Sequence, residues 1–456
     1  MSQVWTTDAL AEWSVGLDGG GLPDAVIAKA EDCILDVIAC AIAGRQSEAT
    51  KRVMAMASAQ YRDGPAGTWF GGNHLHATGA AFINSTAASI LDLDDGHRLP
   101  CGHPGAAVVP TALAVAQETN ASGLDVLAAV IAGYEVCTRI GGSEHRIAYH
   151  TGNWTGFGAA TTAARLRGMD TESLAQALAV TAYHGPRVAD LTLSTDMGAN
   201  VKESIPWSVV AGLNAADLAA QGFTGCRDAL DIDERFVPAQ AAAGLGDGFL
   251  IMRTYFKRYS ACRWVHAAVE ALMQIMAEQN LSALDIESVR VETFHQAASL
   301  NNLVDPPSLE SAQYSIPYCL GLAAVYGDQA LTPMADDHLH DHRAIAFADN
   351  VNVICDDALI DSFPATVPSR VYVETSSAAY EAFIERPWGE PDGPTGRTDL
   401  IDKFHTLADE RISKARASAI IDAVENLKDD GVDPLMTLLV DPMDAASTEL
   451  QEAAHG

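Results

Sequence analysis

Basic residues are scarce in this chain of 456 residues. It has 28 lysines and arginines against 60 aspartates and glutamates, which gives a formal charge of −32. A surface this acidic repels phosphate backbones and anionic lipids, so we expect neither nucleic acid nor a membrane as a partner. If the substrate is itself an anion, the few cations must be concentrated where it binds.

Three other features are missing from the sequence. No apolar run reaches the ~20 residues that a membrane-spanning helix needs. Residues 1–13 lack the basic and apolar regions of a secretory signal. The eight cysteines include no CxxC pair, which argues against a zinc ribbon, an iron–sulfur cluster and a disulfide framework. We therefore expect a reduced, cytoplasmic protein.

Helical periodicity dominates roughly the first 250 residues. Apolar residues from Val26 to Ala41 recur at helical spacing, after Pro23 and before Gly44. Six further helices are predicted at 80–91, 106–119, 124–140, 158–167, 173–183 and 209–221. Alanine is abundant throughout, which favours helix formation and close packing between helices.

The pattern changes after about His266. Alternation typical of half-buried strands predicts strands at 287–294 and 369–375, and a third at 351–355. A Pro/Gly-rich connection at 385–397 is followed by renewed helical periodicity. The predicted fold class is mainly α, with an all-helical domain at 1–266, a smaller α+β domain at 267–395, and C-terminal helices at 396–456 that return to the helical domain.

Ionisable side chains gather in four segments that could carry chemistry. The first is LDLDDGHRLPCGHPG at 91–105, and the others lie at 145–158, 198–207 and 255–266. Their candidate residues are Asp92, Asp94, Asp95, His97, Arg98, His103, His145, His150, Lys202, Lys257, Arg258, Arg263 and His266.

Several kinds of site are poorly supported by these segments. None has a metal-ligand spacing such as HExxH, and HLHDH at 338–342 is more typical of a solvated acidic loop. The glycine-rich stretches at 151–158 and 244–248 fit neither GxGxxG nor a P-loop, and are typical of turns and helix starts. No serine or cysteine lies in a nucleophile elbow.

Acid–base chemistry on a small anion is the remaining possibility. Histidine exchanges protons near neutrality, while lysine and arginine hold carboxylates and stabilise developing negative charge. A pocket shared by His103, His150, Lys202 and Lys257 would supply the local cations that an acidic chain needs. Spacing alone does not show that they meet, since each could equally be a capping histidine or a surface lysine.

Six segments resemble signatures of the MmgE/PrpD family and occur in the family's order. They are DLDDGHRLPCGHPGAAVVPTALAVAQ, TGNWTGFGAATTAARLRGMD, NAADLAAQGFTGCRDAL, YFKRYSACRWVHAAVEAL, AQYSIPYCLGLAAVYGD and DLIDKFHTLAD. The family includes 2-methylcitrate dehydratase, cis-aconitate decarboxylase and iminodisuccinate epimerase. The resemblance implies a large helical domain joined to a smaller α+β lid domain, a homodimer, and neither metal nor organic cofactor.

The resemblance also implies roles for individual residues. Asp92 and His103 match the acid–base residues of the family's DxDD…H motif, and His150 matches its second active-site histidine. Lys202 matches a lysine that meets a substrate carboxylate, and Lys257 matches the lysine before the tyrosine in the motif at the domain junction, which we expect to be catalytic.

Three further residues are expected to bind substrate. Tyr318 falls where decarboxylase-like members of the family place a substrate-facing tyrosine. Arg263 and His97 come from the same ionisable segments as the predicted catalytic residues, and we expect them to contact the substrate.

The chain departs from the family's pattern around these positions. His150 is followed by TGN, where the family often has PTG, and Lys257 is followed by RYS instead of PYP. Glu203 stands where the family often has a basic residue after the lysine. Gly96 follows the paired aspartates, where the decarboxylases carry threonine. The ionisable core is kept while substrate-shaping positions change.

The leading hypothesis is a cofactor-independent lyase that removes a proton next to a carboxylate of a small polycarboxylate. Dehydration of a 2-methylcitrate-like hydroxy acid ranks first, with His150 or His103 exchanging the proton and the other assisting the leaving group. Decarboxylation of a cis-aconitate-like acid, or epimerisation of an iminodisuccinate-like acid, would use the same residues. The competing class is a non-catalytic helical dimer that binds a metabolite.

Overall fold

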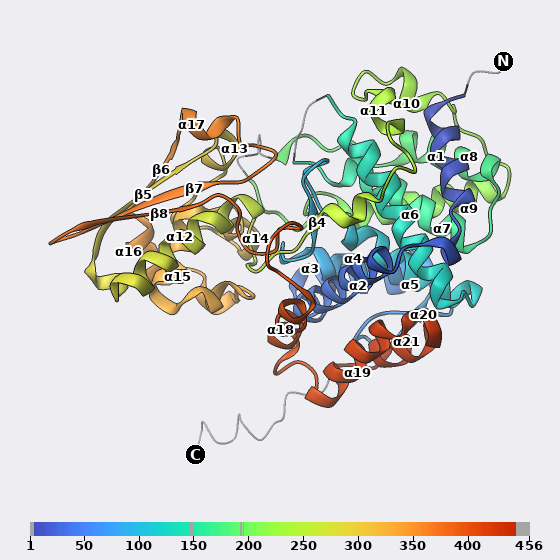
Figure 1. Cartoon of the computed structure of the whole chain (residues 1–456). Coiled ribbons are helices and arrows are strands. Elements are labelled where there is room, and N and C mark those ends of the chain that lie inside the picture. Colours follow the sequence, from blue (N-terminus) through green and yellow to red (C-terminus); the bar gives the residue numbers. More distant parts are fainter. Residues whose placement is uncertain (1–3, 146–148, 192–193, 195, 444–456) are drawn as a thin grey trace.

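A computed structural model of the chain describes residues 4–145, 149–191, 194 and 196–443. It has two lobes, one built from the helices of the N-terminal half and one that carries a β-sheet (Figure 1). The helices of the larger lobe are α1 (Thr6–Gly16), α2 (Asp24–Gly44), α3 (Glu48–Gln60), α4 (Ala77–Ser89), α5 (Gly105–Thr119), α6 (Gly123–Gly142), α7 (Gly152–Leu166), α8 (Thr171–His184), α9 (Ile205–Ala220), α10 (Ala229–Ile232) and α11 (Pro238–Ala242).

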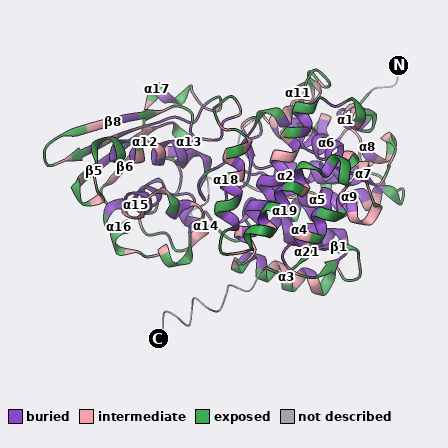
Figure 2. Cartoon of the chain, turned by 60° about the horizontal axis from the view of Figure 1, so that its bottom comes forward, coloured by how far each residue is buried: buried purple, intermediate pink, exposed green. Residues whose placement is uncertain are grey.

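Small residues place α4 at the centre of the larger lobe. Every residue from Ala77 to Ser89 is buried, and α4 packs against α2, α5 and α9. Alanine, serine and threonine let neighbouring helices approach closely, so a helix can be enclosed on all sides. Figure 2 shows this buried interior surrounded by exposed outer helix faces. The helix is therefore a rigid support for the loop that follows it.

The smaller lobe combines a mixed four-stranded sheet with helices. Its elements are α12 (Arg263–Gln279), β5 (Ile286–Thr293), α13 (His295–Ala298), α14 (Leu309–Ala312), α15 (Ile316–Tyr326), α16 (His342–Ala348), β6 (Val351–Cys355), α17 (Asp357–Ile360), β7 (Ser369–Thr375) and β8 (Ala379–Ile384). The strand order is β6-β5-β7-β8, with β5 and β6 parallel and the other pairs antiparallel. Helix α12 packs against β7, β8 and α15.

The last helices pack against the larger lobe. They are α18 (Arg397–Ala408), α19 (Lys414–Glu425), α20 (Leu427–Asp430) and α21 (Asp433–Val440). Their buried apolar residues join the core of the N-terminal helices, and α18 packs against α2. A second core gathers mainly residues of 259–382. The domain limits at 266/267 and 395/396 stay a prediction.

Most elements predicted from periodicity are confirmed, and the differences have physical causes. The three predicted strands match β5, β6 and β7 to within a residue. Helix α7 begins at Gly152, six residues before the prediction, because its glycines lie inside a tightly packed helix instead of a turn. The predicted change at His266 falls inside α12. Helix α15 is not predicted from the sequence, because it is apolar on nearly every side and its apolar residues show no helical periodicity.

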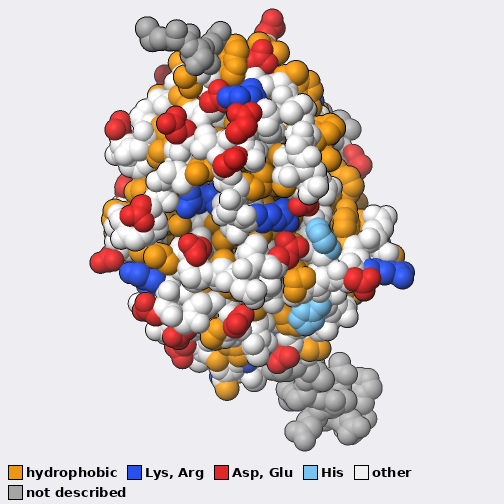
Figure 3. All heavy atoms as spheres, turned by 90° about the vertical axis from the view of Figure 1, so that its right-hand side faces the viewer, with side chains coloured by type: hydrophobic (Ala, Val, Ile, Leu, Met, Phe, Trp, Pro, Cys, Tyr) orange, Lys and Arg blue, Asp and Glu red, His pale blue; other side chains and the backbone are white. Residues whose placement is uncertain are grey.

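The surface carries the acidic excess without a single dominant patch on the face in view. Figure 3 shows acidic side chains scattered over the larger lobe, with few lysines or arginines between them. Within the described residues, no helix combines the length and apolarity needed to cross a bilayer.

Candidate active site

The loop between α4 and α5 carries the first cluster of ionisable residues. Helix α4 ends at Ser89, two residues before the predicted end, and Pro104 precedes the first residue of α5. Asp92 has a positive φ of 52°, a left-handed backbone that few residues other than glycine adopt. The loop is thus anchored at both ends by buried helices and holds Asp92 in a strained conformation.

A short antiparallel pairing connects this loop to the segment between the lobes. Strand β3 (Gly96–His97) pairs with β4 (Thr254–Tyr255), which places Lys257 close to the loop. Gly96 is needed there, because a Cβ at this position would lie 2.4 Å from the ring and hydroxyl of Tyr255.

Three of the residues expected from the sequence meet at the carboxylate of a fourth, Asp92. Lys202 Nζ donates to Asp92 Oδ1 at 2.7 Å, and Lys257 Nζ lies 3.0 Å from Oδ2. His103 Nε2 is 3.2 Å from Oδ1. Asp92 and Lys257 are 0 % exposed, His103 1 % and Lys202 4 %. The structure therefore brings two ammonium groups and an imidazole onto one buried carboxylate.

The charges in this cluster shift one another's pKa values. Burial opposes ionisation of Asp92, but Lys202 and Lys257 outweigh it and hold the pKa of the carboxyl well below its usual range. For Lys202, burial is likewise outweighed by Asp92, which raises the pKa of the ammonium. For Lys257, burial dominates and lowers the pKa, with Asp92 opposing and Lys202 adding to the decrease.

His103 is held between acceptors on both ring nitrogens. Its Nδ1 is 2.9 Å from the carbonyl oxygen of Asp95 and 3.5 Å from Asp94 Oδ2, while Nε2 faces Asp92. Burial would lower the pKa of His103, but Asp94 and Asp92 raise it to about 10. The ring is therefore an imidazolium at neutral pH, with an N–H on each side.

Two tyrosines complete the cluster, and sequence reasoning did not find them. The Tyr149 hydroxyl lies 3.4 Å from His103 Nε2 and 3.5 Å from Asp92 Oδ1. The Tyr314 hydroxyl accepts a hydrogen bond from Lys202 Nζ at 2.9 Å. The two rings pack edge to face with centroids 5.9 Å apart. The only signal for Tyr149 was its place directly before His150.

A second set of contacts holds the Asp92 loop in position. Lys403 of α18 donates to Asp36 Oδ1 at 2.6 Å and to the Leu93 carbonyl at 2.8 Å. Asp95 accepts hydrogen bonds from the Gly105 backbone and the Tyr134 hydroxyl. Burial raises the pKa of Asp95 to about 7, with the Asp36 carboxylate adding to the effect. The C-terminal helices thus help to position the loop.

A metal ion could in principle use part of this cluster. Ligand atoms of Asp92, His103 and Glu203 all lie within 4.8 Å of one another. However, Lys202 Nζ lies 2.7 Å from Asp92 and 3.6 Å from Glu203, and a histidine must be deprotonated to bind a metal. The donor set as arranged fits proton transfer and anion binding better than a divalent ion.

His150, predicted to be catalytic, is directed to a different partner. Its Nε2 pairs with the Glu144 carboxylate, and the side chain is almost fully buried. Within the described residues, it is the neighbouring Tyr149 that contacts His103. A carboxylate on one ring nitrogen fixes the tautomer and leaves the other nitrogen for proton exchange.

The three residues expected to bind substrate have structural partners in the described part of the chain. His97 Nε2 lies 3.1 Å from the Leu250 carbonyl, and burial lowers the pKa of the ring to about 3. Arg263 donates to the Phe256, Pro387 and Trp388 carbonyls and pairs with Glu390. The Tyr318 hydroxyl donates to the His338 carbonyl. None of these contacts belongs to the Asp92 cluster.

Two cavities flank the seam between the lobes. One, of about 510 Å³, is lined by Leu91 and by Gln313 and Met334 of the smaller lobe. The other, of about 560 Å³, is lined by Arg98 and Glu144, and across the seam by Glu390. Both reach residues adjacent to the cluster or to His150.

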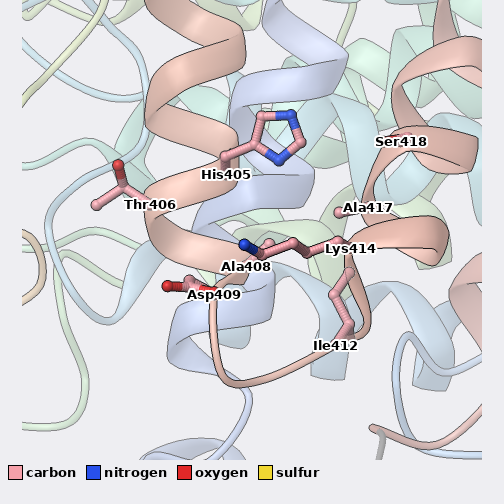
Figure 4. A pocket seen from close by; sticks show the side chains of 8 residues that line it. All are labelled: His405, Thr406, Ala408, Asp409, Ile412, Lys414, Ala417 and Ser418. Atoms are coloured by element: carbon pink, nitrogen blue, oxygen red, sulfur yellow. The ribbon is translucent and has the colours of Figure 1, made fainter.

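A further hollow of about 430 Å³ lies between α18 and α19 (Figure 4). Lys414 extends there toward α18, and His405 lies above it. None of the eight residues that line this hollow belongs to the Asp92 cluster, so we assign it no part in the site.

The fold is mainly α, with a larger lobe built mostly from helices and a smaller lobe that carries a four-stranded sheet. The two lobes meet at a buried cluster of carboxylates, lysines and a histidine, which is a candidate acid–base site. The sequence profile of the MmgE/PrpD N-terminal domain matches residues 8–242, and that of the MmgE/PrpD C-terminal domain matches residues 259–429. The chain belongs to the MmgE/PrpD family.

Two curated relatives match over nearly the whole chain. A cis-aconitate decarboxylase of Aspergillus terreus is 24% identical over 478 aligned positions, which cover 96% of this chain and 96% of the relative. The cis-aconitate decarboxylase-like protein oryM of Aspergillus oryzae is 23% identical over 467 positions, covering 92% and 94%.

Proposed function

We propose that this protein is a cofactor-independent lyase that abstracts a proton next to a carboxylate of a small polycarboxylate. The observation that carries the proposal is the convergence of Lys202, Lys257 and the His103 imidazolium on Asp92. Cations buried around one anion form a site for carboxylates, and an adjacent acid can assist a leaving group. Membership of the MmgE/PrpD family and relatives named as cis-aconitate decarboxylases support the same class of substrate.

The proposed mechanism divides acid and base between two histidines. Substrate carboxylates bind Lys202 and Lys257, which also stabilise the negative charge that develops when the proton leaves. His150, oriented by Glu144, removes the proton. His103, held as an imidazolium by Asp92 and Asp94, donates a proton to the departing hydroxyl.

The smaller lobe acts as a lid in this proposal. Asp92, Lys202 and Lys257 are buried, so the substrate enters only when the lobes separate. Tyr314 belongs to the smaller lobe's core and contacts Lys202 across the seam. Closure brings the two sides together and excludes water, which strengthens the interaction of the lysines with a bound anion.

We favour dehydration of a 2-methylcitrate-like hydroxy acid over decarboxylation. Gly96 stands where the decarboxylase pattern has threonine, and Tyr255 fills the space that a threonine side chain would need. Decarboxylation of a cis-aconitate-like acid is the second candidate, because one relative described above is named a cis-aconitate decarboxylase and the other a cis-aconitate decarboxylase-like protein. Epimerisation of an iminodisuccinate-like acid would use the same proton abstraction.

A substrate panel tests the proposal directly. The protein is incubated with citrate, 2-methylcitrate, cis-aconitate and iminodisuccinate, and each reaction is followed by its own product. New ultraviolet absorbance from a double bond marks dehydration, released carbon dioxide marks decarboxylation, and a change of optical rotation marks epimerisation. A double bond formed from a hydroxy acid is the expected result. No change in any of the four acids would favour a non-catalytic metabolite-binding dimer.

Three further proposals concern the oligomeric state, the location and the cofactor requirement of the protein. We propose a homodimer located in the cytoplasm, and a reaction that needs no metal or organic cofactor. Light scattering on the purified protein measures the oligomeric state. Exhaustive dialysis against a chelator should leave turnover intact, and activity that returned only with a divalent ion would contradict the assignment of His103 as a proton donor.

A further inference from the structure

Glu203 is a buried carboxylate beside the proposed site that the mechanism does not use. It lies between Lys202 and α9, is 0 % exposed, and is flanked by two residues with positive φ, Lys202 at 47° and Ser204 at 59°. A backbone held in this strained form fixes the direction of the Glu203 side chain.

The two oxygens of Glu203 have different surroundings. Oε2 accepts hydrogen bonds from both the backbone N–H and the hydroxyl of Thr151. Oε1 has no hydrogen-bond partner among the described residues, and lies 3.6 Å from Lys202 Nζ. Thr151 therefore anchors one oxygen and leaves the other available as an acceptor.

The available oxygen lies beside the proposed anion site, because Oε1 is the Glu203 oxygen nearest to Lys202 Nζ, at 3.6 Å. Ligand atoms of Glu203, Asp92 and His103 lie within 4.8 Å of one another. A buried acceptor without a donor is unfavourable, and a ligand that supplies an O–H or N–H relieves that cost. A ligand that lacks such a donor leaves the cost in place, and a carboxylate placed there would also be repelled.

We propose that Glu203 is a specificity residue that accepts a hydrogen bond from a hydroxyl or amino group on the substrate, and so selects donor-bearing acids over acids without a donor. The inference rests on the proposed function, because it assumes that substrate carboxylates bind Lys202 and Lys257. It favours hydroxy or amino acids as substrates and disfavours an unsaturated acid that carries only carboxylates.

Three four-carbon dicarboxylates test this inference. Malate, aspartate and succinate carry a hydroxyl, an ammonium and no donor on the same skeleton. Calorimetric titration of the full-length protein should show malate or aspartate binding at least about tenfold more tightly than succinate, the scale of one hydrogen bond to a charged acceptor. If malate binds more tightly than aspartate, the preferred donor is a hydroxyl, and the opposite order indicates an ammonium.

Two variants distinguish the contribution of the Glu203 carboxylate from that of the residues around it. Glu203→Met removes the acceptor, and the preference over succinate should fall to near unity. Glu203→Gln keeps the shape, and its amide oxygen satisfies Thr151, which turns the NH₂ group toward the ligand. That variant should therefore lose most of any preference for aspartate. Glu48→Gln, at an exposed position of α3, is the matched control for the loss of one negative charge.

Four results would overturn the inference. Equal affinities of the wild-type protein for all three acids would show that the protein does not select donor-bearing acids. The proposed anion site would not be contradicted by that result. An unchanged preference in both Glu203 variants would place the selection elsewhere. Binding that requires a divalent ion and vanishes with chelator would assign Glu203 to a metal. Failure of all three acids to bind a protein that turns over an acid of the substrate panel would overturn this inference alone, whereas failure in a protein that is inactive on the whole panel would contradict the proposed function as well.

Discussion

Asp92 and Lys202 are 110 residues apart in the chain, and their side chains meet at 2.7 Å. Both have a left-handed backbone, with φ of 52° and 47°. Two strained residues that contact each other inside a protein indicate a geometry that the surrounding helices enforce. In the proposed function, this pair is the part of the anion site that exists before substrate binds.

Asp92→Asn should destabilise the protein strongly. The substitution leaves Lys202 and Lys257 buried without their carboxylate partner, which costs about 3–5 kcal/mol for a broken buried ion pair. Thermal unfolding measures the effect, with Asp392→Asn as a control on an exposed aspartate. Equal melting temperatures for both variants would show that the lysines find another partner.

His103→Gln should lower turnover by roughly 10²-fold or more, the usual scale for loss of a general acid. His97→Gln, in the same loop, is the control because His97 is buried against Leu250 and apart from the cluster. We expect the control to unfold at lower temperature but to keep its turnover per folded molecule. Similar losses of turnover in both variants would contradict the role given to His103.

The two histidines show what sequence reasoning could and could not resolve. They lie six residues apart in one motif, yet burial lowers the pKa of His97 to about 3, while Asp94 and Asp92 overcome burial and raise that of His103 to about 10. Only the resemblance to family motifs favoured His103, because the spacing in the sequence does not show which histidine faces the aspartates.

The protonation of His103 predicts a dependence of stability on pH. A histidine in the unfolded chain loses its proton near pH 6.5, whereas His103 in the folded chain keeps it to about 10. The folded state binds more protons between these values, so the stabilisation is complete below pH 6.5 and lost as pH rises through about 10.

Melting temperatures of the wild type and of His103→Gln, measured from pH 6 to pH 10, check this dependence. The difference between the two proteins should shrink as pH rises. A difference that stays constant over this range would mean that His103 is already neutral in the folded protein.

Glu390→Gln should weaken the connection between the lobes. Glu390 pairs with Arg98 of the Asp92 loop and with Arg263 of α12, and all three are at least partly buried. Removing its charge leaves two arginines without their carboxylate, so we expect a destabilisation of about 3 kcal/mol. Thermal unfolding measures it, and Glu385→Gln, at an exposed position nearby, should have little effect.

Arg263 was expected to contact the substrate because of its place in the sequence. Its position beside Lys257 in a cationic segment gave the expectation, but its guanidinium donates to three backbone carbonyls that only the folded chain brings near. Regular strands such as β7 were predictable from alternation alone. Tyr149, Tyr314 and the contact of Glu203 with Thr151 depend on tertiary structure and left no pattern in the sequence.

The most direct test of the central claim is hydrogen–deuterium exchange into a substrate acid in D₂O. An acid–base lyase should exchange the proton next to the carboxylate, and proton NMR measures this exchange. The variant His103→Gln should keep the exchange while losing elimination. His150→Gln should lose both, because His150 is the proposed base. Acids that stay unlabelled with the wild-type protein, in the presence of demonstrated binding, would contradict the proposed chemistry.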